Sequence, residues 1–282
     1  MSSIAERRAT FRKLHERGCF VIPNPWDIGT ARYLQHLGFK ALATTSAGFA
    51  FTRGLADGAV PRDAMLAYIA EIVANSDVPV NADFEGGYAH EPQGVAESVR
   101  LCIGTGVAGL SIEDATGDKE KPIYDFDLAV ARMKAARRAI DSAGGDVLLT
   151  GRCECFLVGR PDLDETVRRL KAYSAAGADC LYAPGLRTRE LIEALIKAVA
   201  PKPVNVLMGA AIGLTGADLA ALGARRISVG GAMARMAWGG FMRIAKEIAA
   251  EGKFDGFGAA AAHAELQSFF QEDAKKRLQH AP

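Results

Sequence analysis

The chain has 282 residues, of which 49% are hydrophobic, and its formal net charge is +1. This length is ample for one large hydrophobic core. The near-neutral charge argues against a nucleic-acid or membrane-surface protein, because those carry strongly basic surfaces. No segment is long and apolar enough to span a bilayer or to act as a signal peptide. Five cysteines, an odd number without small-scaffold spacing, indicate reduced thiols in a cytoplasmic protein.

The predicted elements alternate along the chain after a polar amphipathic helix in residues 1–18. Short apolar runs recur at a spacing of roughly 25–35 residues, which is typical of β/α units. Glycines, such as those in "HLGFKAL" and "SAAGADCLY", end helices and turn the chain into the next strand. The eight predicted strands are residues 19–23, 41–46, 78–83, 108–114, 146–152, 178–184, 203–208 and 225–231.

Eight β/α units without a linker predict an α/β fold, a closed (β/α)8 TIM-type barrel. A doubly wound open sheet is the alternative, but no G-x-G-x-x-G follows the first strand. We therefore expect residues 1–282 to form one barrel domain. After the last strand, a helix, a turn at 252–256 and one more helix follow. Residues 258–282 are expected to form an extra C-terminal helix that packs on the barrel's own flank or on a partner subunit.

Charged residues gather where the predicted strands end, and barrel enzymes place their chemistry at these carboxyl ends. Four acids from neighbouring loops form a set that we call the acid cluster: Asp57, Asp83, Glu85 and Glu113. Like charges this close cannot all stay ionised without a cation. Oxygen ligands without His or Cys select a hard ion, so we expect Mg2+ or Mn2+ as the cofactor.

Two further features accompany the acid cluster. Arg152 ends the apolar run "DVLLTGR". Such an arginine either forms a buried ion pair that supports the fold or binds a carboxylate or phosphate in a bidentate manner. Beside a metal site, the second role is favoured. The stretch "TTSAGF" adds a hydroxyl and backbone N–H groups around Gly48, and such donors can hold a developing oxyanion.

With these residues in place, the chain resembles the isocitrate lyase/phosphoenolpyruvate mutase superfamily, especially its shorter members. The motifs "TTSAG", "ADFEGGYA", "LSIEDATG", "GRCECF" and "PVNVL" occur in the family's order at the matching strand ends. The likeness covers nearly the whole chain. It implies a barrel whose last helix is exchanged with a neighbouring subunit, usually in a homotetramer. It also implies Mg2+, a small carboxylic-acid substrate and an enolpyruvate-like oxyanion.

The resemblance further implies two sets of site residues. The metal would be held by Asp83 directly and, through metal-bound water, by Asp57, Glu85 and Glu113. The substrate would be bound by the cradle Ser46, Ala47 and Gly48, by Arg152 with Glu154 orienting it, and by Asn205. Of these, Arg152, Ser46 and Glu113 are the expected catalytic residues.

The loop after the fourth strand departs from the family. Members that cleave isocitrate or methylisocitrate carry a catalytic cysteine and a histidine there, whereas residues 115–125 read "ATGDKEKPIYD". The glutamate that these lyases place after the sixth strand is also missing. The phosphonomutase loop is not matched either, although Lys119 and Lys121 occupy that region.

Several functions therefore remain open. The leading hypothesis is cleavage of a C–C bond, such as decarboxylation, in a small α-oxo or 2-hydroxy carboxylic acid. The alternatives are phosphonopyruvate mutase or hydrolase chemistry and a catalytically silent oxo-acid binder. A phosphate site in "SVGGAMAR" is a further reading, for which close packing of the turn is the simpler explanation.

Overall fold

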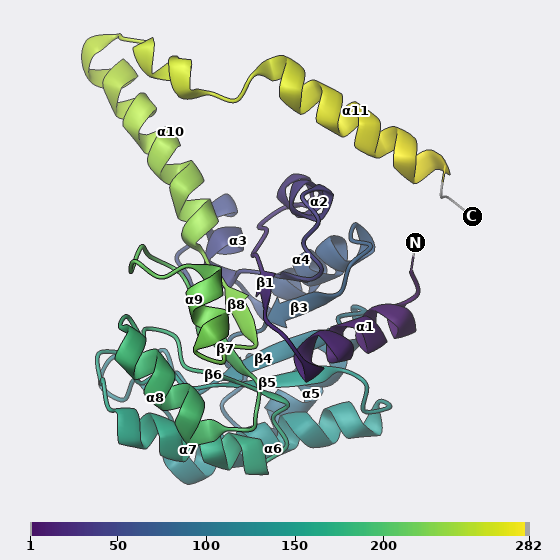
Figure 1. Cartoon of the computed structure of the whole chain (residues 1–282), viewed down its shortest axis with the longest axis vertical. Helices are drawn as coiled ribbons and strands as arrows, with labels where there is room; N and C mark the ends of the chain where they lie inside the picture. Colours follow the sequence, from purple (N-terminus) through teal and green to yellow (C-terminus); the bar gives the residue numbers. More distant parts are fainter. Residues whose placement is uncertain (1, 280–282) are drawn as a thin grey trace. The chain divides into compact units, whose positions relative to one another are not determined.

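The computed structural model describes residues 2–279, which divide into two compact units, residues 2–231 and residues 232–279. The first unit contains eight strands, each inside its predicted range (Figure 1). The predicted TIM-type barrel is therefore confirmed. The strands are β1 (Phe20–Ile22), β2 (Leu42–Ala43), β3 (Val80–Asp83), β4 (Gly109–Glu113), β5 (Leu148–Arg152), β6 (Cys180–Tyr182), β7 (Val204–Leu207) and β8 (Arg226–Ser228).

The strands form one parallel sheet in the order β1-β8-β7-β6-β5-β4-β3-β2. Two hydrogen bonds at the carboxyl ends of β1 and β2 bring the two edges together. The Ala43 N–H donates to the Pro23 carbonyl at 3.0 Å, and the Asn24 amide donates to the Thr44 carbonyl at 2.9 Å. The barrel is thus nearly closed, and its parallel strands present all their carboxyl ends at one end of the barrel.

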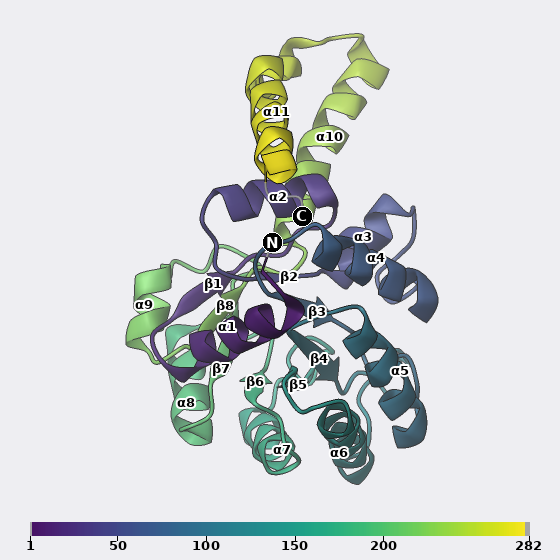
Figure 2. The same cartoon turned by 90° about the vertical axis from the view of Figure 1, so that its right-hand side faces the viewer.

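Helices alternate with the strands and surround them, as α5, α6, α7 and α8 show most clearly in Figure 2. The α3 helix was not predicted, because its first residue, Ser46, continues an apolar run that reads as strand. The helices of this unit are α1 (Ile4–Glu16), α2 (Ile28–His36), α3 (Ser46–Thr52), α4 (Arg62–Ala74), α5 (Pro92–Gly104), α6 (Phe126–Ser142), α7 (Leu163–Ala175), α8 (Arg189–Val199) and α9 (Gly216–Ala221).

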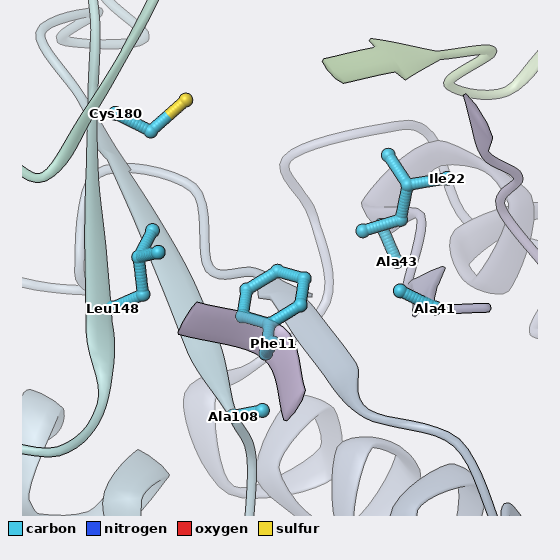
Figure 3. Packing of buried hydrophobic residues seen from close by; sticks show 7 residues of the cluster. All are labelled: Phe11, Ile22, Ala41, Ala43, Ala108, Leu148 and Cys180. Carbon is cyan, nitrogen blue, oxygen red and sulfur yellow. The ribbon is translucent and has the colours of Figure 1, made fainter. Parts of the chain in front are cut away.

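Helix α1 fills the amino end of the barrel. Its Phe11 is fully buried among small residues at the starts of the strands, including Ala41, Ala108 and Cys180 (Figure 3). The ring lies 4.6 Å from His15 and 6.4 Å from Phe20, both edge-on. Since this end of the barrel is filled by packing, the carboxyl end is the one left for chemistry.

A polar layer crosses the barrel interior above this plug. The buried Arg226 donates to the side-chain oxygens of Asn205 at 2.9 Å and Thr150 at 3.1 Å. Burial, followed by the Arg226 charge, lowers the pKa of His15 to about 3, so this histidine is neutral. The barrel core is therefore closed by hydrogen bonds as well as by apolar contacts.

The second unit consists of α10 (Ala232–Glu251), the short 3-10 helix η1 (Asp255–Ala259) and α11 (His263–Gln279). The sequence pattern predicts this helix from Gly240, and α10 begins earlier, at Ala232. Large apolar side chains on this unit are exposed, among them Met236, Phe241 and Leu278. The predicted segment 258–282 contains α11, and its last three residues lie outside the described part of the chain. None of the helices within residues 2–279 has the length and apolar character needed to cross a membrane.

Candidate active site

Three of the predicted site residues meet where three neighbouring strands end. Asp83, Glu113 and Arg152 are the last residues of β3, β4 and β5. Glu113 and Arg152 are register partners in the β4–β5 ladder. The parallel register therefore delivers two acids and the arginine to the same rim of the barrel, as the sequence predicted.

Arg152 is held by three carboxylates. Its Nη1 lies 3.2 Å from Asp83 Oδ1 and 3.0 Å from Glu113 Oε2, and its Nε donates to Glu154. The guanidinium also lies 5.1 Å from the centre of the Tyr182 ring. None of the described residues accepts a hydrogen bond from its Nη2. One donor of this nearly buried arginine thus remains available to a ligand.

The charges at the site are strongly coupled. Burial raises the pKa of Glu113 well above its usual value, and the Arg152 charge opposes this only in part. Burial by itself would lower the pKa of Arg152, but the charges of Glu113 and Glu154 hold it well above its usual value. Arg152 is therefore charged, and its charge offsets only part of the cost of burying the Glu113 carboxylate.

Glu85 and Asp57 extend this negative region. Burial raises the pKa of Glu85 to about 7; the Asp83 charge adds to the rise, and a 2.9 Å hydrogen bond from Tyr88 opposes it. Asp57 lies in a loop that is largely exposed, yet partial burial of its carboxyl and the charge of Asp83 raise its pKa as well. The carboxyl groups of the acid cluster therefore interact electrostatically at one place on the rim.

The turn that carries Glu85 is fixed by an arginine that sequence reasoning missed. Glu85 and Tyr88 have φ values of 46° and 55°, which side chains other than glycine rarely adopt. Arg132 of α6 is buried beneath this turn. It donates to three backbone carbonyls there, those of residues 86, 89 and 90. The only hint in the sequence was an arginine within the apolar face of a helix.

The predicted cradle lies at the start of α3. Ser46 donates from its N–H (3.1 Å) and its hydroxyl (3.2 Å) to Asp83 Oδ2. The Gly48 N–H donates to the Thr45 side chain at 3.2 Å, which caps the helix. The Ala47 N–H has no acceptor among residues 2–279. Two of the three expected donors are therefore already engaged, and Ala47 carries the free one.

Asn205 lies apart from this network. Its amide donates to Ser228 at 2.9 Å and its oxygen accepts from Arg226, both within the barrel interior. Within residues 2–279, no hydrogen bond joins it to Arg152 or to the acid cluster. Its contact with a substrate stays a prediction.

The loop of residues 115–125 forms a compact hairpin beside the site. Ala115 and Ile123 form an antiparallel bridge, and the Thr116 N–H donates to the Pro122 carbonyl at 3.1 Å. Lys121 pairs with Asp125 at 2.6 Å, within the loop. This segment is therefore ordered by its own contacts.

The donor set fits a hard divalent cation by its chemistry and charge. All candidate ligands are carboxylates, and burial together with the charges of neighbouring acids raises the pKa of Asp57, Glu85 and Glu113. The arrangement itself does not converge on a metal, because Arg152 Nη1 lies between Asp83 and Glu113. Within the described chain, no three His, Cys, Asp or Glu side chains are placed to bind a metal together.

Comparison with known proteins gives a consistent result. Residues 11–249 match the family model of phosphoenolpyruvate phosphomutase. The chain is 49% identical to a protein of Burkholderia cenocepacia J2315 that is described provisionally as a lyase/mutase, with a TM-score of 0.90 over 95% of this chain and 96% of that one. It is 32% identical to the oxaloacetate decarboxylase of Paraburkholderia xenovorans over 69% of this chain and 66% of the relative.

A third similarity concerns 2,3-dimethylmalate lyase, a phosphoenolpyruvate mutase/isocitrate lyase superfamily member. Its structure gives a TM-score of 0.81 at 27% identity and covers all of both chains. The fold, the motifs at the strand ends and the family model agree. The chain therefore belongs to the phosphoenolpyruvate mutase/isocitrate lyase superfamily of lyases and mutases.

Proposed function

We propose that this protein is a Mg2+-dependent enzyme that breaks a C–C bond of a small α-oxo or 2-hydroxy carboxylic acid. The reaction would pass through an enolpyruvate-like intermediate. One observation carries the proposal: the Asp83 carboxylate joins Arg152 on one oxygen to Ser46 on the other. The arginine fork and the start of α3 are thereby held around the same carboxylate.

Two free donors in this arrangement suit an oxo acid. Arg152 Nη2 would bind the substrate carboxylate, because a guanidinium matches the geometry of a carboxylate. The Ala47 N–H would donate to an oxygen on which negative charge develops. When bound at the acid cluster, Mg2+ would supply Lewis-acid stabilisation of that charge. Glu113 and Glu154 keep Arg152 charged and oriented.

Decarboxylation of an oxaloacetate-like acid is the simplest reaction for these groups. The bond to the leaving carboxylate breaks, its electron pair moves toward the oxo oxygen, and carbon dioxide departs. The carbon left behind then takes a proton from solvent. No cysteine acid is needed for the bond cleavage, which is compatible with a 115–125 loop without cysteine or histidine. The similarity to oxaloacetate decarboxylase supports the same choice.

The test is calorimetric titration of oxalate and of pyruvate, each with and without Mg2+. Oxalate is a planar dianion that imitates the pyruvate enolate, so a site built for the enolate should bind it more tightly than pyruvate. Binding should require Mg2+ and should be lost in the presence of EDTA. Equal affinity for the two anions, or oxalate binding indifferent to Mg2+, would contradict the proposal.

A turnover screen then separates the reaction classes. Oxaloacetate, methylisocitrate, isocitrate and phosphonopyruvate would each be incubated with the protein and Mg2+, with Mg2+ alone as the blank for spontaneous decay. We expect turnover of an oxo or hydroxy acid by C–C cleavage. Turnover of phosphonopyruvate alone would indicate P–C chemistry, and tight oxalate binding without any turnover would indicate a silent binder.

A further inference from the structure

We infer that Asp114 is a positioning residue, which sets Arg152 through Glu154 and ties the 115–125 loop to the same support. The inference rests on the proposed function for its effect on ligand binding. Asp114 directly follows Glu113 at the end of β4. Neighbouring residues of a strand point to opposite faces, so Glu113 faces the site and Asp114 faces helix α7.

Asp114 is buried and surrounded by donors. Its Oδ1 accepts from the Glu154 backbone N–H at 2.8 Å. Its Oδ2 accepts from Arg169 Nη1 at 3.2 Å and from the Tyr173 hydroxyl. The residue is 3% exposed, so water does not replace these partners. The carboxylate thus links β4, the segment after β5 and α7 at one point.

The first consequence concerns Arg152. Glu154 is fixed twice, by its backbone on Asp114 and by its carboxylate on Arg152 Nε. Glu113 holds the same guanidinium directly at Nη1. Two successive residues therefore position Arg152 from two sides: Glu113, the last residue of β4, by contact, and Asp114, directly after it, through Glu154.

The second consequence concerns the loop. The Tyr124 N–H donates to the Asp114 carbonyl at 2.9 Å, and Arg169 Nη1 donates to the Tyr124 carbonyl at 2.9 Å. Both ends of the hairpin therefore meet on the pair formed by Asp114 and Arg169. A shift at the base of the loop would therefore displace the Asp114 carboxylate, which accepts from the Glu154 N–H.

A carboxylate is required because every partner of Asp114 is a donor. An asparagine offers one acceptor oxygen and one NH2 group. Whichever way the amide turns, its NH2 faces either the Glu154 N–H or the donors of Arg169 and Tyr173. In a buried place this leaves a donor without an acceptor. Asp114→Asn should thus break the link while nearly preserving the side-chain volume.

Asp179 provides a matched control at the opposite end of the strands. Its carboxylate accepts from the Leu149 backbone N–H at 2.8 Å and pairs with Arg137 at 3.1 Å. It therefore makes the same kinds of bond as Asp114, but near the start of β5, whereas Asp114 bonds to the segment that follows Arg152 at the end of β5. Asp179→Asn should lower the melting temperature and leave ligand affinity unchanged.

The experiment compares the full-length wild type, Asp114→Asn, Asp179→Asn and Tyr173→Phe. We expect Asp114→Asn to weaken Mg2+-dependent oxalate binding at least tenfold, with a smaller loss in the same direction for Tyr173→Phe. Hydrogen exchange on the metal-free, ligand-free proteins should show faster exchange at the Glu154 amide and in residues 115–124 for Asp114→Asn, but not for Asp179→Asn.

The two readouts separate the two ideas. A wild type that does not bind oxalate refutes the proposed function, and the exchange data then decide the positioning role alone. Unchanged exchange at Glu154 in Asp114→Asn overturns the inference, as does a loss of affinity equal to that of Asp179→Asn. If Asp114→Asn does not fold, Tyr173→Phe decides: wild-type affinity and wild-type exchange at Glu154 overturn the inference, and a loss in both supports it.

Discussion

The guanidinium of Arg152 contacts Asp83 and Glu113 through Nη1 and Glu154 through Nε, and an ammonium group, with one nitrogen, cannot reproduce this planar fork. We expect Arg152→Lys to weaken Mg2+-dependent oxalate binding by on the order of 2–5 kcal/mol, because the fork is lost and buried acids are left unpaired. Calorimetric titration of the variant measures the loss.

The control for this variant is Arg137→Lys. Arg137 pairs with Asp141 and Asp179, away from the acid cluster. It should retain wild-type oxalate affinity. A similar affinity in Arg152→Lys and the wild type would remove Arg152 from the binding site.

The raised pKa of Glu85 predicts a pH dependence for metal binding. With a pKa of about 7, its carboxyl keeps a proton at pH 6 and loses it by pH 8 in the metal-free protein. A cation must displace that proton, so Mg2+ affinity should rise about tenfold from pH 6 to pH 8. Calorimetry in two buffers of different ionisation enthalpy would detect the released proton.

Glu85→Gln tests the assignment of this titration. The amide cannot titrate, so the variant should bind Mg2+ more weakly and with a flatter pH profile. An unchanged profile in the variant would place the titrating group elsewhere.

At the residue scale, the sequence identified the groups at the rim but missed those behind it. Asp83, Glu113 and Arg152 could be predicted because charged residues at the ends of apolar runs are conspicuous. The roles of Arg132, Arg169 and Tyr173 could not be predicted, because they depend on how the faces of α6 and α7 pack against the loops. The hydrogen bond from Ser46 to Asp83 could not be predicted either, because the sequence indicates a substrate contact for Ser46 and a metal contact for Asp83.

At the scale of elements, Gly109 allows α1 to seat against β4. A Cβ there would lie 2.6 Å from the Phe11 ring, 2.8 Å from Asn81 Oδ1 and 3.1 Å from the Leu148 carbonyl oxygen. Because one of these neighbours is backbone, the strain cannot be relieved by side chains alone. We expect Gly109→Ala to lower the free energy of unfolding by about 1–3 kcal/mol, measured by urea denaturation.

Gly104 at the end of α5 is the matched control. A Cβ there has no neighbour within 4 Å, and its φ is not in the left-handed region. Gly104→Ala should be neutral or stabilise by up to about 1 kcal/mol. Equal destabilisation by both substitutions would show that the close packing at Gly109 is not the cause.

The elements were largely predictable because their periodicity is local. Each predicted strand range contains a strand, although β2 is only Leu42–Ala43. Helix α3 was missed because Thr45, which caps it, follows an apolar run and reads as its continuation. The capping hydrogen bond from Gly48 decides the boundary, and a single sequence does not show that bond.

At the scale of the whole molecule, we propose a homo-oligomer, with a tetramer as the expected form. Leu266 and Phe270 of α11 are 44% and 42% exposed, and a second copy of the chain would cover them. Deletion of residues 258–282 should therefore cause dissociation or aggregation in light scattering. The full-length protein should have the mass of an oligomer.

A milder change guards against misfolding of the truncated chain. The double substitution Leu266→Lys/Phe270→Lys should reduce the mass, whereas Gln267→Lys, on the same helix, should not. A full-length chain that is a stable monomer would contradict the proposal.

The excess of acid over base at the barrel rim has a kinetic consequence. The single guanidinium of Arg152 faces three carboxylates, those of Asp83, Glu113 and Glu154, so the rim repels a dicarboxylate until more positive charge arrives. Addition should then be compulsory in order, with the divalent ion first and the organic anion second. In double-reciprocal plots of initial rate against substrate concentration, the cation concentration would change the slope and leave the intercept at saturating substrate unaltered.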